Sequence, residues 1–168
     1  MPMLTTLAIR NVVLIEALDL AFGPGLGVLT GETGAGKSIL LDSLGLALGV
    51  RADTGLVRQG QPQASVAAEF ELPSDHAAFA LLSEQGIESE PGEPLLVRRT
   101  LKSDGGSGAF AGGAGVPASL LRDIANGLVE IHGQHDDRGL LNPRGHRSLL
   151  DAFGNIDGRG CEQAFRGW

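Results

Sequence analysis

The stretch Gly31-Glu32-Thr33-Gly34-Ala35-Gly36-Lys37-Ser38 decides the fold, because it fits the phosphate-loop pattern G-x-x-x-x-G-K-[ST] at every fixed position. Its glycines let the backbone curl so that N–H groups face phosphate oxygens. The Lys37 ammonium suits the outer phosphates and the Ser38 hydroxyl suits Mg²⁺. We therefore predict an ATP or GTP site in which residues 31–38 bind the phosphates and Ser38 also binds the metal.

The residues on both sides of this loop form the strand–loop–helix setting that the motif requires. Residues 26–30 are a short apolar run, which predicts a buried strand. Residues 38–48 carry apolar side chains on most sides, which predicts a covered helix that stops at Gly49. Together these segments predict an α/β fold of the P-loop NTPase type, with a mixed sheet and flanking helices.

Hydrophobic patterning predicts the other elements of this fold. Alternation and short apolar runs predict strands over residues 4–9, 18–22, 66–72, 95–101 and 128–131. Helices are predicted over residues 75–85, capped by Ser74 or Asp75 and ended by Gly86, and over residues 117–125 and 143–153, each with a proline in its first turn. Residues 104–115 contain six glycines and fit either a hairpin tip or a mobile loop.

Composition and charge narrow the class of protein. The net charge of −7 comes from residues 69–93, which hold seven acidic residues and no Lys or Arg, a pattern typical of a solvated face. The remaining residues are neutral as a group, so the charge does not exclude a nucleic-acid partner. Cys161 is the one cysteine, which excludes an internal disulfide. The sequence shows no membrane span and no secretory signal, so we predict a cytoplasmic protein without a membrane partner.

Two blocks of residues extend the signal beyond the phosphate loop. The first comprises residues 29–40, 44–49, 51–53 and 56–60, and the second is the run V-E-I-H-G-Q-H at residues 129–135. Together they resemble the N-terminal head of SMC-like ATPases and, among these, the bacterial RecN family of recombination and repair proteins. The resemblance covers nearly the whole chain. It implies an ABC-type head of which residues 1–153 form the N-terminal lobe and residues 154–168 the truncated start of a coiled-coil arm.

The resemblance also implies further site residues and a function. Gln134 would contact Mg²⁺ and the attacking water, and Arg58 would contact a phosphate or DNA. The intact protein would bind ATP with Mg²⁺ between two heads and close as a homodimer on DNA during double-strand break repair. Its partners would be DNA, its own C-terminal head lobe and a second copy, in the cytoplasm at the nucleoid.

This chain departs from the family pattern in two respects. Gly106, Gly108 and Gly112 stand where the family has two arginines and an asparagine, which removes polar anchors from the glycine-rich segment. The chain also has no L-S-G-G-like signature, and Ala152 follows Asp151 where hydrolysis would need a second acid. We therefore predict that the chain alone binds ATP and does not hydrolyse it.

Several alternatives stay open at this point. A small P-loop kinase would share the phosphate loop, and a non-catalytic interaction fragment would need no nucleotide. Other side chains fit either a site or an ordinary surface: His132, His135 and Asp136 as metal ligands, Arg98 and Arg99 as phosphate contacts or a surface pair, and Arg138, Arg144 and Arg147 as a DNA-facing patch or solvated residues.

Overall fold

The computed structural model describes residues 2–30, 35–90, 92–129, 131, 150 and 154. The chain forms two compact units, Met1–Ile131 and His132–Trp168, and every helix and strand bounded below lies in the first. None of the helices in the described part of the chain has the length and apolar run that crossing a bilayer requires. The predicted division after residue 153 and the predicted arm remain predictions, because residues 155–168 lie outside the described residues.

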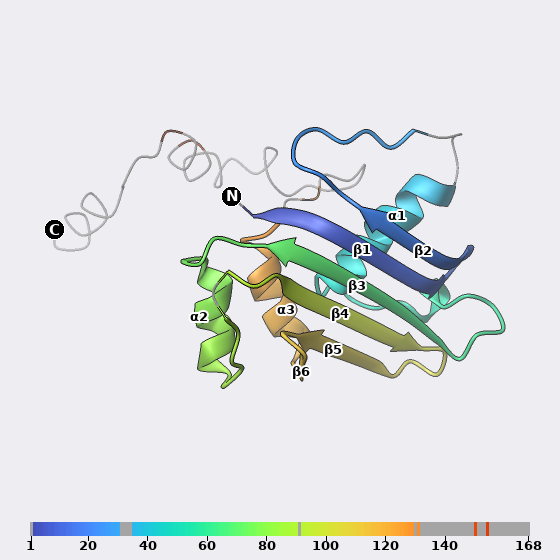
Figure 1. Ribbon diagram of the computed structural model, residues 1–168. Helices are drawn as coiled ribbons and strands as arrows, with labels where there is room; N and C mark the ends of the chain where they lie inside the picture. The colour runs from blue at the N-terminus through green and yellow to red at the C-terminus, as the bar shows by residue number, and fades with distance from the viewer. Residues whose placement is uncertain are drawn as a thin grey trace, which may run out of the picture. The chain divides into compact units, whose positions relative to one another are not determined.

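The first unit is built on one six-stranded sheet with the order β2-β1-β3-β4-β5-β6 (Figure 1). Its strands are β1 (Met3–Val12), β2 (Ile15–Ala21), β3 (Gln63–Glu71), β4 (Leu95–Lys102), β5 (Ser107–Ala111) and β6 (Ala114–Gly115). The helices are α1 (Ala35–Ala47), α2 (Ala77–Glu84) and α3 (Ala118–Ala125), with a short 3-10 turn η1 (Thr54–Leu56). We expected a mixed sheet, whereas every pairing between these strands is antiparallel.

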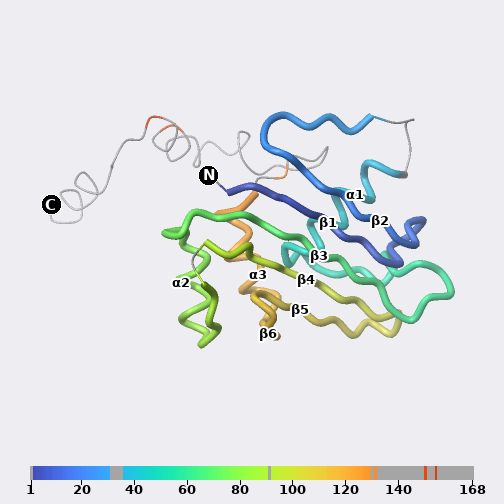
Figure 2. The backbone as a smooth tube through the Cα atoms, viewed as in Figure 1, coloured from blue at the N-terminus to red at the C-terminus, as the bar shows by residue number. Residues whose placement is uncertain are grey.

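One face of the sheet carries the core because apolar residues alternate along the central strands. The buried positions are Leu7 and Ile9 on β1, Ala64, Val66, Ala68 and Phe70 on β3, and Leu95, Val97 and Leu101 on β4. Helix α1 contacts β1, β3 and β4, and α3 contacts β5. Figures 1 and 2 show α1 and α3 behind the sheet and no described helix in front of it, so the opposite face faces solvent.

Most predicted elements are confirmed. The structure has a strand at each of the four predicted positions from residue 4 to residue 101 other than 26–30, and a helix at 38–48, 75–85 and 117–125, with ends shifted by a few residues. Gly49 and Gly86 follow α1 and α2 with φ of 86° and 71°, the left-handed conformation expected of a helix stop. The acidic residues of 69–93 are exposed apart from half-buried Glu69, as a solvated face requires.

The predicted buried strand at residues 26–30 is wrong. This segment forms no strand, and Leu26, Val28 and Leu29 are 96%, 75% and 55% exposed. An apolar run becomes a buried strand only when another strand supplies hydrogen bonds to its backbone, and no described strand pairs with this one. The strand predicted at 128–131 is likewise absent at Leu128, Val129 and Ile131, the described residues of that segment.

Three local predictions also need correction. Helix α2 is capped by His76 rather than by Ser74 or Asp75, since its Nδ1 accepts a 3.2 Å hydrogen bond from the backbone N–H of Ala78. Pro117 is the N-cap residue of α3 and precedes its first turn. The glycine-rich segment is more than a hairpin tip or a loop, because the whole of β5 lies between its two turns.

Candidate nucleotide site

The described part of the phosphate loop is the N-terminal turn of α1. Gly36, Lys37 and Ser38 lie in this turn and are exposed, and the turn contains no acidic residue. The space where a Cβ would stand at Gly36 is open to at least 4 Å. The first N–H groups of a helix have no partner within it, so this end is suited to phosphate oxygens. Residues 31–34 and the side chain of Ala35 lie outside what the structure describes.

Burial of the rest of α1 fixes the direction of that turn. Ile39, Leu46, Ala47 and Leu48 pack into the core at 6% exposure or less. Ser43 is fully buried, and its Oγ donates a 2.6 Å hydrogen bond to the carbonyl of Ile39, so its hydroxyl needs no partner outside the helix. The polar end of α1 therefore faces solvent while its apolar side is held by three strands of the sheet.

Arg58 lies against the turn that connects β1 and β2. Its Nη1 donates a 2.7 Å hydrogen bond to the carbonyl of Leu14, and its Nη2 lies 4.0 Å from Oε2 of Glu16. Its backbone N–H donates to the carbonyl of Asn11 at 2.9 Å. Asn11 and Val13 take φ of 54° and 47°, which is rare for side chains other than glycine. The structure thus gives Arg58 an anchoring role at this turn, and its contact with a phosphate or with DNA stays a prediction.

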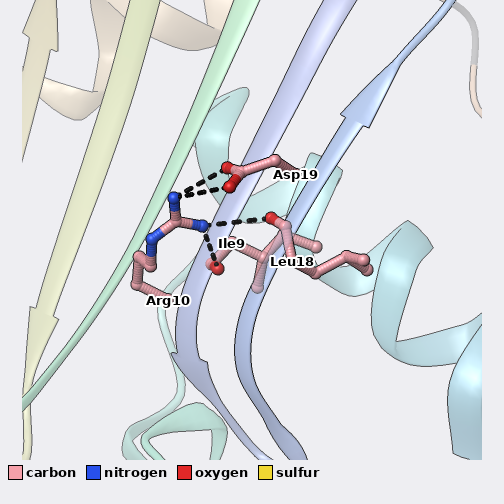
Figure 3. Close-up of polar contacts among 4 residues, drawn as sticks. All are labelled: Ile9, Arg10, Leu18 and Asp19. Carbon is pink, nitrogen blue, oxygen red and sulfur yellow. Dashed lines mark hydrogen bonds and ion pairs between the residues drawn. The ribbon is translucent and has the colours of Figure 1, made fainter.

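The resembling block at the start of the chain is held by a second arginine on the same hairpin (Figure 3). Nη2 of Arg10 donates to both carboxylate oxygens of Asp19 at 2.7 and 2.9 Å. Its Nη1 donates to the carbonyls of Ile9 and Leu18 at 2.9 and 3.2 Å. Both side chains are substantially exposed, so the ion pair fixes the orientation of β1 and β2 more than it stabilises the fold.

Arg98 and Arg99 do not form the surface pair that their sequence allowed. Arg98 is exposed, and its guanidinium lies 4.4 Å from the ring centroid of Phe110. Arg99 points to the opposite face and is 5% exposed, within the core. The sequence did contain the signal, because Leu95, Val97 and Leu101 alternate along β4 and place Arg99 on their side.

The remaining predicted site residues lie outside the described part of the chain. They are Gln134, the histidines and aspartate considered as metal ligands, and the arginines at 138, 144 and 147. Within the part that is described, no group of three or more His, Cys, Asp or Glu side chains could hold a metal ion. The roles assigned to these residues stay predictions.

Comparison with known proteins places the chain in a family. Residues 6–116 match the AAA domain family. The chain belongs to this family. The DNA repair protein RecN of Xylella fastidiosa (strain Temecula1) is 41% identical to this AAA domain over 151 residues, which are 90% of the chain and 27% of RecN. RecN of Haemophilus influenzae is 44% identical over 153 residues, again covering 90% of the chain and 27% of the relative. The resemblance to RecN is therefore confirmed, and the chain spans 27% of the length of these relatives.

A solved structure supports the fold of the AAA domain. A chain described in work on the ATP-driven dimerisation and DNA-stimulated activation of SMC ATPases superposes with a TM-score of 0.62 at 21% identity. The match covers 88% of this chain and 97% of that one. This confirms the predicted fold class, the N-terminal lobe of an SMC-type head.

Proposed function

We propose that this AAA domain is the ATP-binding lobe of a RecN-like, SMC-family ATPase that acts in DNA double-strand break repair and recombination. The observation that carries the proposal is the exposed turn at Gly36, Lys37 and Ser38, which begins a helix buried against the sheet. A phosphate-loop sequence at the free end of a fixed helix is the arrangement that phosphate binding needs. The RecN relatives supply the repair context.

The residues present fit Mg²⁺-ATP. The backbone N–H groups of residues 31–38 would hold the phosphates, Lys37 would neutralise their charge, and the Ser38 hydroxyl would bind the metal, with Gln134 as a further metal and water contact. When bound, the nucleotide supplies a phosphoanhydride bond whose cleavage releases free energy. This chain holds and orients that group, and we propose that it does not cleave it alone.

The exposed segment 26–30 gives a physical reason for a partner lobe. Three large apolar side chains there have no core to enter, although they directly precede the phosphate loop. The relatives contain far more polypeptide than this chain, since it spans 27% of their length. We propose that their C-terminal head lobe covers this segment, and that the completed heads pair through ATP and act on DNA.

Thermal unfolding with and without Mg²⁺-ATP tests nucleotide binding. A ligand of the folded state at 100 times its Kd stabilises by about 2.7 kcal/mol, which for a chain of this size is an increase in Tm of several degrees. Lys37→Ala should abolish that increase. The chain has a single other lysine, exposed Lys102, so Lys102→Ala is the matched control and should keep it. No increase in Tm for the unaltered chain would contradict the proposal and favour a non-catalytic interaction fragment.

Phosphate release tests whether the chain hydrolyses ATP by itself. We expect a rate for the unaltered chain that does not exceed the rate for Lys37→Ala, because no described residue supplies a catalytic acid beside the phosphate loop. A turnover clearly above that of Lys37→Ala would show that the chain contains a complete catalytic site and would favour the small-kinase or independent-ATPase alternatives.

A further inference from the structure

Arg99 occupies a position in the core that its neighbours fill with apolar side chains. Cross-strand register aligns Ile9, Val66, Arg99 and Ala109 in one row over β1, β3, β4 and β5. The three neighbours are 0%, 0% and 6% exposed, and Arg99 is 5% exposed. Among the described residues, Arg99 is the one buried side chain that carries a charge. Its guanidinium therefore lies where the sheet otherwise excludes water.

Nothing in the described part of the chain compensates this charge. The Nε of Arg99 is fully buried and has no hydrogen-bond partner. The two ion pairs among the described residues involve other arginines, Arg10 and Arg58. Burial, and then the positive charge of nearby Arg122, lower the pKa of the Arg99 guanidinium. Leaving a buried charge unpaired destabilises a fold by several kcal/mol, so this arginine lacks the anion that would normally accompany it.

The second arginine lies where α1 ends against α3. A Cβ at Gly49 would stand 2.6 Å from the carbonyl oxygen of Ala118 and 3.0 Å from Cγ of Arg122. The carbonyls of the last turn of α1 are occupied, because those of Leu44, Gly45 and Leu46 accept backbone N–H groups from residues 48, 50 and 49 respectively. The end of α1 therefore does not neutralise the two arginines. Arg122 itself is exposed, which leaves this position open to solvent.

We propose that Arg99 and Arg122 form an oxyanion site, distinct from the phosphate loop, that binds a doubly charged tetrahedral ion such as phosphate or sulfate. A guanidinium donates two parallel hydrogen bonds to an oxyanion, and the second positive charge favours a dianion. The 5% exposure of Arg99 admits a small ion and excludes a macromolecule. The site lies at the C-terminal end of the 13-residue helix α1, about 20 Å along the helix from the phosphate-loop turn.

The test uses the full chain carrying Lys37→Ala, so that binding at the phosphate loop does not contribute. Tm is measured against sodium sulfate and against sodium chloride at equal ionic strength. We expect a saturable increase in Tm with sulfate that Arg99→Met abolishes. Arg122→Met should weaken the apparent affinity by about tenfold, the effect of losing one charge-assisted contact. Arg98→Met, on the opposite face of the same strand, should leave the response unchanged.

Two further measurements separate this site from general effects of the salt. Sulfate stabilises many proteins by exclusion from their surface, and that part persists in the Arg99→Met variant. The ¹H–¹⁵N resonance of the Arg99 Nε–H should shift during the titration and saturate at the same concentration as Tm. If Arg99→Met does not fold, Arg99→Lys replaces it, because lysine keeps the charge without the planar fork and should weaken binding by about tenfold.

Three outcomes would overturn the proposal. These are no saturable sulfate response in the Lys37→Ala chain, an equal response in Arg99→Met and Arg98→Met, or protection by acetate as strong as that by sulfate, which would make the ligand a carboxylate. Stabilisation of the unaltered chain by Mg²⁺-ATP is measured separately and depends on Lys37. Failure of the oxyanion site therefore leaves the proposed nucleotide binding intact, and the reverse also holds.

Discussion

At the scale of single residues, Arg99 gives the clearest test of the energetics. In a buffer without oxyanions, Arg99→Met should raise the free energy of unfolding by about 1–4 kcal/mol, because an apolar side chain of similar length replaces an unpaired buried charge. Urea denaturation measures the change. Arg98→Met is the control and should lower the free energy of unfolding by less than about 1 kcal/mol, through loss of its contact with the ring of Phe110. A larger loss in Arg99→Met than in Arg98→Met would contradict this account.

His76 is a second residue whose side chain has a specific structural task. Its Nδ1 caps α2, and its Nε2 lies 3.1 Å from the carbonyl oxygen of Gly127, which joins the start of α2 to the segment after α3. His76→Ala should lower the free energy of unfolding by about 1 kcal/mol, and amide hydrogen exchange in the first turn of α2 should accelerate. His76→Asp keeps an acceptor at the cap position and should recover most of the loss. Equal exchange in all three chains would show that the cap contributes nothing.

The sequence predicted residue-scale features only where the local pattern is enough. The phosphate-loop residues follow from a motif with fixed positions, and the stops at Gly49 and Gly86 follow from a conformation that glycine favours. The role of His76 could not be predicted in this way, because its second contact is to Gly127, far along the chain. Arg99 was misplaced because its charge suggested the surface, while the alternation of β4 places it in the core.

At the scale of elements, the junction of α1 with α3 depends on the absence of a side chain at Gly49. Gly49→Ala should lower the free energy of unfolding by more than about 2 kcal/mol, because the new Cβ meets the Ala118 carbonyl in addition to the strain at a φ of 86°. Gly86 follows α2 with a φ of 71° and open space around it, so Gly86→Ala should cost only about 1 kcal/mol. Equal losses for the two variants would show that the close approach of α1 and α3 carries no energy.

Predictions of strands succeeded where alternation fixed one buried face and failed where an apolar run stood alone. The β3 and β4 strands have clear alternation, and each has a neighbour on both sides. Residues 26–30 and 128–131 are apolar without alternation, and such runs form strands only when a partner supplies hydrogen bonds. The sequence of one element contains no information about whether that partner is present.

At the scale of the whole molecule, the exposed segment 26–30 should be dispensable for the stability of this chain and essential for its proposed partner. The double variant Leu26→Ser and Val28→Ser should change the free energy of unfolding by less than about 0.5 kcal/mol, because both side chains already face water. Ile9→Ala, at a fully buried position, is the control and should cost about 2–5 kcal/mol.

Binding to the missing lobe supplies the second half of this test. The polypeptide that corresponds to the C-terminal head lobe of the RecN relatives should associate with the unaltered chain and fail to associate with the double variant. Undiminished association would place the interface elsewhere and would leave the exposure of residues 26–30 without a functional explanation.

The position of β1 between β2 and β3 also determines the order in which the molecule folds. The β1–β2 hairpin and the run from β3 to β6 each join strands that are close in the chain, whereas the β1–β3 ladder must close the long connection that contains α1. Closing such a connection is entropically costly and slow compared with forming hairpins. Because α1 packs on both β1 and β3, its core contacts become complete only in that late step. During synthesis, the chain therefore acquires a fixed phosphate-loop helix only after β3 has been made and has found β1.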